Sequence, residues 1–261
     1  MMNRIQTGAL PAAAASYRPG SSAESAIYSL DTDDCCSFFT PLHYESNYAY
    51  PLLVWLHGPR GDENHLKKVM PLVSMRNYVA IGLRGTVGVE LNSGRRAYEW
   101  SQAVGQIHAA EQRLLEGLDR AQDRFNVSAH RIFLAGHACG GTMALRLAMR
   151  HPRLFAGAMS LGGGFPSGNS PLVQLGQARN VPLLLCCGRS ATRYPTSEVC
   201  NDLRLFHTAG ISVTLRQYPC GDELMPQMFS DMDRWIMEQI LPSAQTSETA
   251  DQLNHPPGGL N

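Results

Sequence analysis

Several features that would narrow the function of a protein are missing from this chain. Its 22 basic and 22 acidic side chains cancel to a formal net charge of zero, so nothing suggests electrostatic steering toward nucleic acid or an anionic membrane. No apolar run approaches the roughly 20 residues of a membrane-spanning helix. No C-x-x-C pair or His/Cys spacing suggests zinc. We therefore expect no nucleic-acid partner, no membrane span, no metal and no cofactor.

The cysteines are a poor disulfide framework. There are seven of them, an odd number, and they include two adjacent pairs. In a chain of this size such a pattern fits a reducing compartment better, so we expect a cytoplasmic protein. They are Cys35, Cys36, Cys139, Cys186, Cys187, Cys200 and Cys220.

A length of 261 residues is typical of one domain with tails. Residues 1–24 are rich in Ala, Gly, Pro and Ser without periodicity, and residues 243–261 are polar and rich in Gly and Pro, so both are predicted to be disordered. The folded domain is then expected over residues 25–242. The first residues resemble a signal peptide only weakly, since their apolar part is short and interrupted by Pro11.

Between the tails, short apolar runs alternate with helical patterns. Continuous apolar runs such as 52–56 and 78–83 are typical of strands buried on both faces. This alternation predicts a mostly parallel central sheet flanked by helices on both faces, with ligands bound at the carboxyl ends of the strands. Further strands are predicted near 131–135, 156–161, 182–186 and 212–215, and helices near 107–125, 142–148, 196–209 and 225–240.

The segment Gly136-His137-Ala138-Cys139-Gly140-Gly141 carries the most information. It lies between a predicted strand and a predicted helix, which is the setting of the nucleophile elbow, G-x-S-x-G. Its third position holds Ala138, whose methyl group cannot attack a carbonyl. The sequence therefore keeps the turn of a hydrolase and lacks its nucleophile.

An ordered set of motifs resembles the α/β-hydrolases of the carboxylesterase, phospholipase and acyl-thioesterase type. The strand ending in His57-Gly58 resembles the one before the oxyanion loop, and the elbow segment follows in the expected order. The resemblance runs from about residue 38 to 240 and implies an α/β-hydrolase fold. The other matching segments are 126–136, 151–158, 160–163 and 218–221.

The resemblance implies a catalytic Ser, acid and His in that chain order. A serine is a weak nucleophile until a histidine accepts its proton, and the acid orients that histidine. The position of the acid, in a His-Gly-x-x-Asp turn, holds Ala191, and the position of the histidine, after Gly221, holds Asp222. A slip of one residue restores no triad. With Ala138 at the elbow, all three positions are predicted to be substituted.

One donor of the oxyanion hole is also expected to be missing. In this family one backbone N–H comes from the residue after His-Gly and another from the residue after the nucleophile. These positions hold Pro59 and Cys139. Proline has no backbone N–H, so only the donor of Cys139 would remain.

Other side chains near these motifs are candidates for a pocket. His57 and His137 are more simply interpreted as support for loops, and Trp100 as either pocket lining or core. The acidic pair Asp222 and Glu223 would bind a cation or polar ligand, or lie in a solvated loop. Cys139 is an alternative nucleophile, although it lies one residue beyond the apex of the elbow. A thiol cluster that includes Cys187 and Cys220 is a further alternative to inert buried cysteines.

The leading hypothesis is a catalytically degenerate hydrolase that binds a small-molecule or protein ligand or acts as a scaffold. The alternative is an active esterase with a non-standard nucleophile such as Cys139. Since fold does not decide function, the sequence leaves both open. It also leaves open a homo-oligomer or a subunit that pairs with an active relative.

Overall fold

The computed structural model describes residues 28–29, 35–91 and 96–253. The predicted disorder of residues 1–24 therefore lies outside the described residues, as does that of 254–261. The last helix, α7 (Pro226–Leu253), continues past residue 242, where the sequence predicts that the folded domain ends. Residues 243–253 contain neither Gly nor Pro, but Pro242 at the boundary lies within the helix and has no N–H for a helical hydrogen bond.

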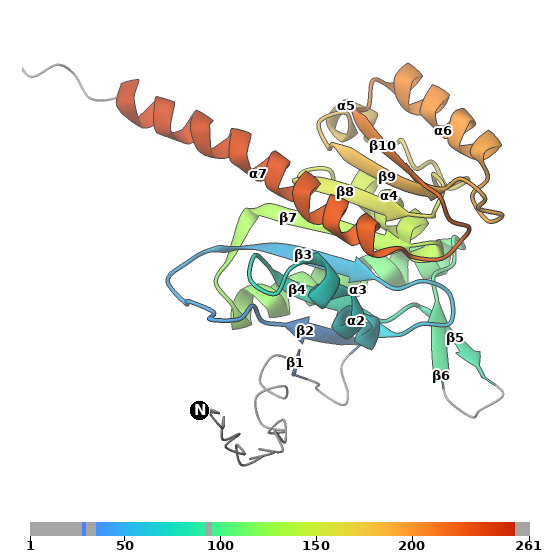
Figure 1. Cartoon of the computed structure of the whole chain (residues 1–261), viewed down its shortest axis with the longest axis horizontal. Coiled ribbons are helices and arrows are strands. Elements are labelled where there is room, and N and C mark those ends of the chain that lie inside the picture. The colour runs from blue at the N-terminus through green and yellow to red at the C-terminus, as the bar shows by residue number, and fades with distance from the viewer. Residues whose placement is uncertain (1–27, 30–34, 92–95, 254–261) are drawn as a thin grey trace, which may run out of the picture.

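A sheet of eight strands forms the centre of the molecule (Figure 1). β1 and β2 pair antiparallel at one edge, and β2 runs antiparallel to β4, whereas the remaining neighbours are parallel. The predicted α/β-hydrolase architecture with a mostly parallel sheet is confirmed. In spatial order the strands are β1 (Tyr28–Ser29), β2 (Cys36–Phe39), β4 (Val79–Leu83), β3 (Tyr50–Leu56), β7 (Val127–His137), β8 (Gly157–Leu161), β9 (Leu183–Gly188) and β10 (Val213–Tyr218).

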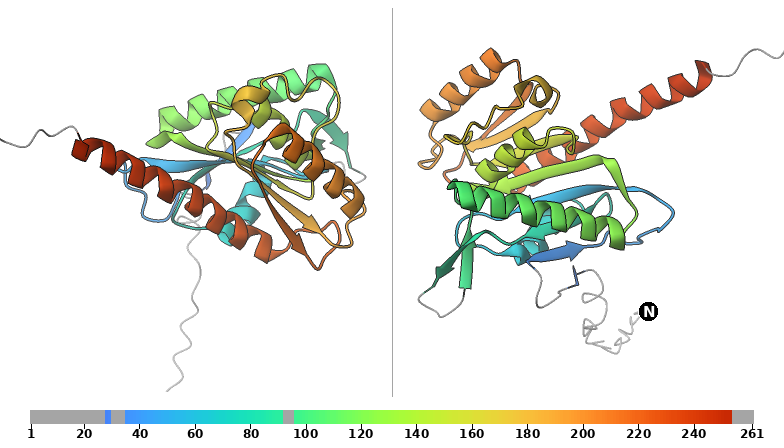
Figure 2. Two further views of the ribbon diagram at one scale, coloured as in Figure 1. Left: turned by 90° about the horizontal axis from the view of Figure 1, so that it is seen from above. Right: turned by 180° about the vertical axis from the view of Figure 1, so that it is seen from behind.

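Helices cover both faces of the sheet (Figure 2). One face packs against α3 (Val104–Arg124), α4 (Cys139–Arg150), α5 (Leu175–Ala178) and α6 (Thr196–Ala209). The other face packs against α2 (Leu66–Val73), which follows the short 3-10 helix η1 (Glu63–His65), and against α7. No helix in the described ranges is long and apolar enough to cross a bilayer.

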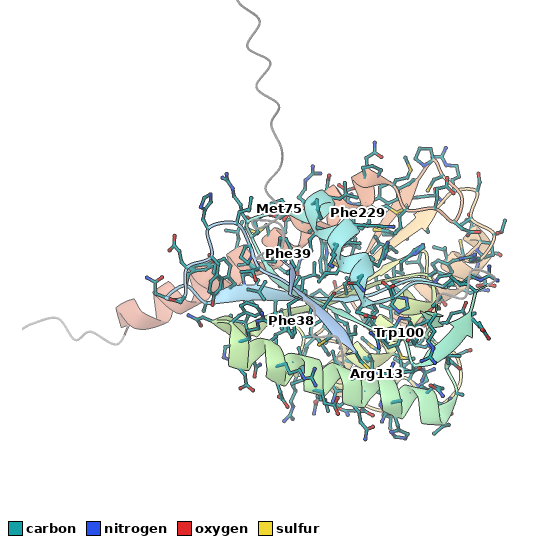
Figure 3. All side chains as sticks on the ribbon, turned by 90° about the horizontal axis from the view of Figure 1, so that it is seen from below. Phe38, Phe39, Met75, Trp100, Arg113 and Phe229 are labelled. Atoms are coloured by element: carbon teal, nitrogen blue, oxygen red, sulfur yellow. The ribbon has the colours of Figure 1, made fainter. Side chains whose placement is uncertain are left out.

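The two cores follow from the two-residue period of a strand. In β3, Leu52, Val54 and Leu56 enter the core under α3 and α4, while Leu53 and Trp55 enter the core under α2 and α7. Figure 3 shows the same division for Phe38 and Phe39 of β2. Burial of each such side chain contributes about 1.5–3 kcal/mol. The apolar runs therefore fix which strands lie at the centre.

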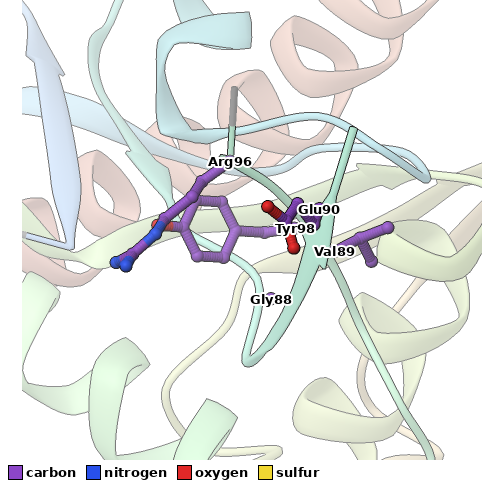
Figure 4. Close-up of a pocket in the computed structure, with 5 residues that line it drawn as sticks. All are labelled: Gly88, Val89, Glu90, Arg96 and Tyr98. Carbon is purple, nitrogen blue, oxygen red and sulfur yellow. The ribbon is translucent and has the colours of Figure 1, made fainter. Parts of the chain in front are cut away.

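Some elements carry too weak a pattern to be predicted. β2 has only four residues, and the hairpin of β5 (Val87–Glu90) and β6 (Arg96–Glu99) is separate from the main sheet and largely exposed. This hairpin carries a cavity of about 530 Å³ (Figure 4). The lining residues are Gly88, Val89, Glu90, Arg96 and Tyr98.

Candidate functional site

The turn between β7 and α4 has the strained backbone of a nucleophile elbow. Ala138 lies at its apex with φ 48° and ψ −117°. A positive φ is uncommon outside glycine and costs about 1–3 kcal/mol. Two backbone hydrogen bonds hold it, from the N–H of Ala138 to the carbonyl of Leu161 at 2.9 Å and from the N–H of Thr142 to the carbonyl of Ala138 at 3.0 Å.

Close backbone approaches surround this apex. A Cβ added to Gly136 would lie 2.4 Å from the carbonyl carbon and oxygen of Gly140. A Cβ added to Gly140 would lie 2.3 Å from the carbonyl oxygen of His57. Real Cβ atoms do not approach backbone so closely, and backbone cannot move aside. We call Gly136, Ala138, Gly140 and His57 the elbow frame.

The loops after β9 and β10 are joined by Asp222. Its Oδ2 accepts a hydrogen bond from the hydroxyl of Thr192 at 2.6 Å, and its Oδ1 accepts the backbone N–H groups of Thr192 at 3.1 Å and Arg193 at 3.0 Å. The bond from the Thr192 hydroxyl, followed by that from the N–H of Arg193, lowers the pKa of Asp222. We call residues 188–193 and 219–223 the paired loops.

His137 connects the elbow to the paired loops. Its Nε2 lies 3.4 Å from the carbonyl oxygen of Asp222. Its Nδ1 would lie 2.3 Å from a Cβ added to Gly58, so the ring fills the space between the loop after β3 and the elbow. Burial lowers the pKa of His137, and the carbonyl of Asp222 opposes the shift. The neighbours of Ala138 and Ala191 thus both contact Asp222, which brings the three predicted positions to one end of the sheet.

His57 is a structural histidine. Its Nε2 accepts the backbone N–H of Gly85 at 2.8 Å, so Nδ1 carries the proton and donates to the carbonyl of Gly58 at 2.7 Å. The ring is fully buried, and burial lowers its pKa. Trp100 is also buried and donates from Nε1 to the carbonyl of His57 at 3.1 Å. Both side chains hold the loop after β3.

The thiol of Cys139 is unsuited to attack. Burial raises its pKa, although a backbone hydrogen bond from Trp100 opposes the shift. A nucleophilic cysteine needs the opposite change. The side chain packs against the core under α3 and α4.

Pro59 and Glu223 each lie in a loop that is closed by a local hydrogen bond. Pro59 is the second residue of a turn in which the N–H of Gly61 donates to the carbonyl of Gly58 at 3.2 Å. Glu223 is exposed, and its Oε1 accepts the N–H of Gly221 at 3.1 Å. The oxygens of Asp222 are therefore engaged by the other paired loop, and one oxygen of Glu223 is engaged by its own loop.

The cysteines near the paired loops lie in different packing clusters. Cys187 packs with Tyr194 and Val199, whereas Cys220 packs in the core under α2 and α7. Burial raises the pKa of Cys186 to about 12. None of the seven cysteines, all of which lie in the described ranges, forms a disulfide.

Sequence reasoning missed Thr192, whose hydroxyl and N–H both bind Asp222. A threonine next to the expected acid carries no signal of its own, because its role depends on an aspartate thirty residues later. The sequence alone does not place the two loops side by side, so it does not indicate this pairing.

Comparison with known proteins identifies the family. Residues 45–240 match the family described as phospholipase/carboxylesterase. A carboxylesterase from Mesorhizobium loti superposes with a TM-score of 0.66 at 18% identity over 81% of this chain and 99% of that one. Acyl-protein thioesterase 2 from Zea mays superposes with a TM-score of 0.61 at 15% identity over 79% of this chain and 99% of that one. SOBER1 from Arabidopsis thaliana superposes with a TM-score of 0.62 at 16% identity over 74% of this chain and 100% of that one. At these identities the structures show the fold alone, while the family match extends over most of the chain. The chain belongs to the phospholipase/carboxylesterase family of α/β-hydrolases.

Proposed function

We propose that this protein is a hydrolase-family member that lacks hydrolytic chemistry and acts by binding a ligand or partner. The observation that carries the proposal is Ala138, which holds the strained apex conformation of the elbow without a hydroxyl. Strain of this kind is retained where a nucleophile must be presented. A methyl group at that point cannot form an acyl-enzyme.

The paired loops support the same proposal. In the family pattern, a histidine on the second loop is oriented by an acid on the first. In this chain Asp222, on the second loop, accepts hydrogen bonds from Thr192 and Arg193 on the first. The two loops remain linked, but in this chain the acid lies on the second loop and the link contains no histidine. It therefore contains no group that would take a proton from a nucleophile at neutral pH.

Pro59 would further limit any residual hydrolysis. It stands where the family supplies an oxyanion donor, and it has no N–H to give. Loss of one such donor costs about 2.7–4 kcal/mol of transition-state stabilisation.

Ester turnover tests the proposal. With p-nitrophenyl acetate and butyrate, the purified protein should release nitrophenol no faster than the same protein after heat denaturation. Cys139→Ala should leave this rate unchanged. Saturable turnover that disappears in Cys139→Ala would replace the proposal with a cysteine esterase, and saturable turnover that survives it would indicate another nucleophile.

The cellular setting is part of the proposal. We assign the protein to the cytoplasm, supported by its seven cysteines, none of which forms a disulfide. Its partner would be a small molecule, a second copy or an active relative. Size-exclusion chromatography with light scattering distinguishes a monomer from a homo-oligomer, and co-purification with an active relative tests the third case.

A further inference from the structure

A cationic cavity lies at the end of α4 that is remote from the elbow. Its volume is about 440 Å³. α4 begins at Cys139 and ends at Arg150, so the two ends are about 17 Å apart along the helix axis. The lining residues are Arg150, His151, Pro152, Arg153, Leu154, Gln174 and Gln177, and none of them carries a carboxylate.

The positive charges around this cavity exceed the negative ones. Glu111 of α3 is the acid that binds here, and it pairs with Arg150 at 3.2 Å and with His151. Arg153 has no ion pair among the described residues, since its Nε donates to the amide oxygen of Gln177 at 3.1 Å. Arg146, four residues before Arg150, is fully buried and binds the carbonyls of the 167–169 loop rather than an acid. Of these three guanidinium groups, only that of Arg150 is therefore paired with a carboxylate.

The guanidinium groups at the cavity make hydrogen bonds within the protein and keep further N–H donors that bind nothing in the described chain. Arg150 uses Nε and Nη2 to bind Glu111, which leaves the two hydrogens of its Nη1 without a partner in the described chain. Arg153 uses only Nε, which leaves both of its terminal nitrogens. Gln174 donates to the carbonyl of Arg150 at 2.8 Å and thereby engages an acceptor at the end of α4 that would repel an anion. These contacts orient Arg150 and engage one nitrogen of the exposed Arg153, and they leave terminal N–H donors of both for a ligand.

We propose that this cavity binds the phosphate group of a phosphate monoester. Two guanidinium groups offer several N–H donors in fixed planes, which matches a tetrahedral dianion with three terminal oxygens. The cavity is larger than a phosphate group, and Pro152 and Leu154 provide apolar walls for the body of the ester. The site does not depend on the proposed function, because no residue of the elbow frame or the paired loops lines it.

Titration of ¹⁵N-labelled full-length protein with glycerol 3-phosphate tests the proposal. We expect saturable shifts of the Leu154 amide and of the Gln177 side-chain amide, with affinity that falls as salt is added. Arg153→Gln should weaken binding by about tenfold or more, since it removes charge-assisted hydrogen bonds. The affinity of Arg153→Lys should fall between those of the wild type and Arg153→Gln, because lysine keeps the charge without the planar donors.

Arg204→Gln is the matched control. Arg204 is also exposed and also bonds only an amide oxygen, that of Asn201, but it lies outside the cavity. It should leave the affinity unchanged. Because Arg153 is exposed, Arg153→Gln should unfold at the wild-type temperature, which separates loss of binding from loss of fold.

A second arm distinguishes the source of the phosphate. Sedimentation with phosphatidylcholine vesicles that contain phosphatidic acid presents the same group on a lipid. Binding to glycerol 3-phosphate alone assigns a soluble ester, and Arg153-dependent binding to the vesicles alone assigns a lipid headgroup; either supports the site. The proposal is overturned if neither probe binds, or if Arg153→Gln and Arg204→Gln bind as tightly as the wild type.

Discussion

The elbow frame and the paired loops belong to the same end of the sheet, yet they differ in how much their side chains contribute to holding them. The frame consists of backbone packed against backbone, with glycines wherever a Cβ would collide. The paired loops also have backbone packed against backbone, since a Cβ added to Gly188 would lie 2.0 Å from the carbonyl oxygen of Gly221 and the N–H of Ser190 donates to the carbonyl of Cys220 at 2.9 Å. They are further linked by the side-chain hydrogen bonds of Asp222. The frame therefore depends on backbone contacts, whereas the link between residues 192–193 and residue 222 depends on the side chain of Asp222. Under the proposed function, this contrast explains how the backbone of the elbow is kept while its catalytic side chains are substituted.

The largest expected effect comes from adding a methyl group to the frame. Gly140→Ala should destabilise the protein by about 3 kcal/mol or more, because the new Cβ meets carbonyl oxygens of His57 and Leu56 at 2.3 and 2.4 Å. Gly105→Ala in α3 is the control, since no atom lies within 4 Å of its Cβ, and it should stabilise by about 0.4–1 kcal/mol. Urea unfolding measures both, and equal stabilities would refute the account of the frame.

A second effect concerns the histidines around the loop after β3. Burial lowers the pKa of His57 and His137, and lowers that of His65 to about 4. Because these folded-state values lie below the usual 6.5, the unfolded chain binds protons first as the pH falls. The stability that these neutral histidines contribute should be fully present above pH 6.5 and should decline toward pH 4.

His65→Gln isolates one part of this decline. His65 is partly exposed, so its share between pH 7.5 and 5 should be about 1–2 kcal/mol. Glutamine still accepts the bond that Trp55 donates to Nδ1, and it does not titrate. Urea unfolding should therefore give a shallower pH dependence for His65→Gln, while His207→Gln, at an exposed position, should follow the wild type. A steeper dependence in His65→Gln would contradict the burial argument.

The paired loops should respond locally and weakly. Asp222→Asn keeps an acceptor for the backbone N–H groups but loses the carboxylate, so we expect a loss below about 1 kcal/mol at neutral pH. Since the folded-state pKa of Asp222 is lowered, its contribution is present at neutral pH and disappears as the pH falls through that value.

Hydrogen exchange separates the two regions. In Asp222→Asn the amides of Thr192 and Arg193 should exchange faster, and that of Thr142 in the elbow should be unchanged. Glu223→Gln is the control, because Glu223 binds only Gly221 among the described residues. Faster exchange at Thr142 would show that the frame depends on the loops.

The smallest expected effect is on activity. Ala138→Ser alone should give no ester turnover, because an added serine would have no base to accept its proton. The triple variant Ala138→Ser, Ala191→Asp, Asp222→His should give at most trace turnover, and adding Pro59→Leu should raise it. Efficient turnover by Ala138→Ser alone would show that a base is already present, and His57 and His137 would then be the residues to test.

The fold was predictable where burial dominates the sequence. Runs such as Leu52–Leu56 are apolar because both faces of β3 are covered, and the glycines around residue 138 report the tight turn directly. The hairpin of β5 and β6 was not predictable, because its half-exposed residues carry only a weak alternation. The pattern that predicts a helix near 225–240 does not indicate its continuation to Leu253, because residues 243–253 are mostly polar.

The candidate site was predictable only in its positions. The order of motifs indicated Ala138, Ala191 and Asp222, whereas the bonds that Asp222 makes depend on loop geometry that no local pattern encodes. The tautomer of His57 likewise depends on Gly85, which lies twenty-eight residues away in the chain. The cavity beside Arg153 was not predictable either. Its cationic side chains are close together in the sequence at 150–153, but the residues that bind them, Glu111 and Gln177, come from other elements that only the folded chain brings near.

Covalent labelling of the wild-type protein with a fluorophosphonate probe tests the central claim most directly. Intact mass and peptide mapping would follow the reaction, with an active esterase of the same family as the positive control. The account predicts no adduct on any serine, because the apex of the elbow holds a methyl group. A stoichiometric adduct on one serine, accompanied by ester turnover, would contradict it.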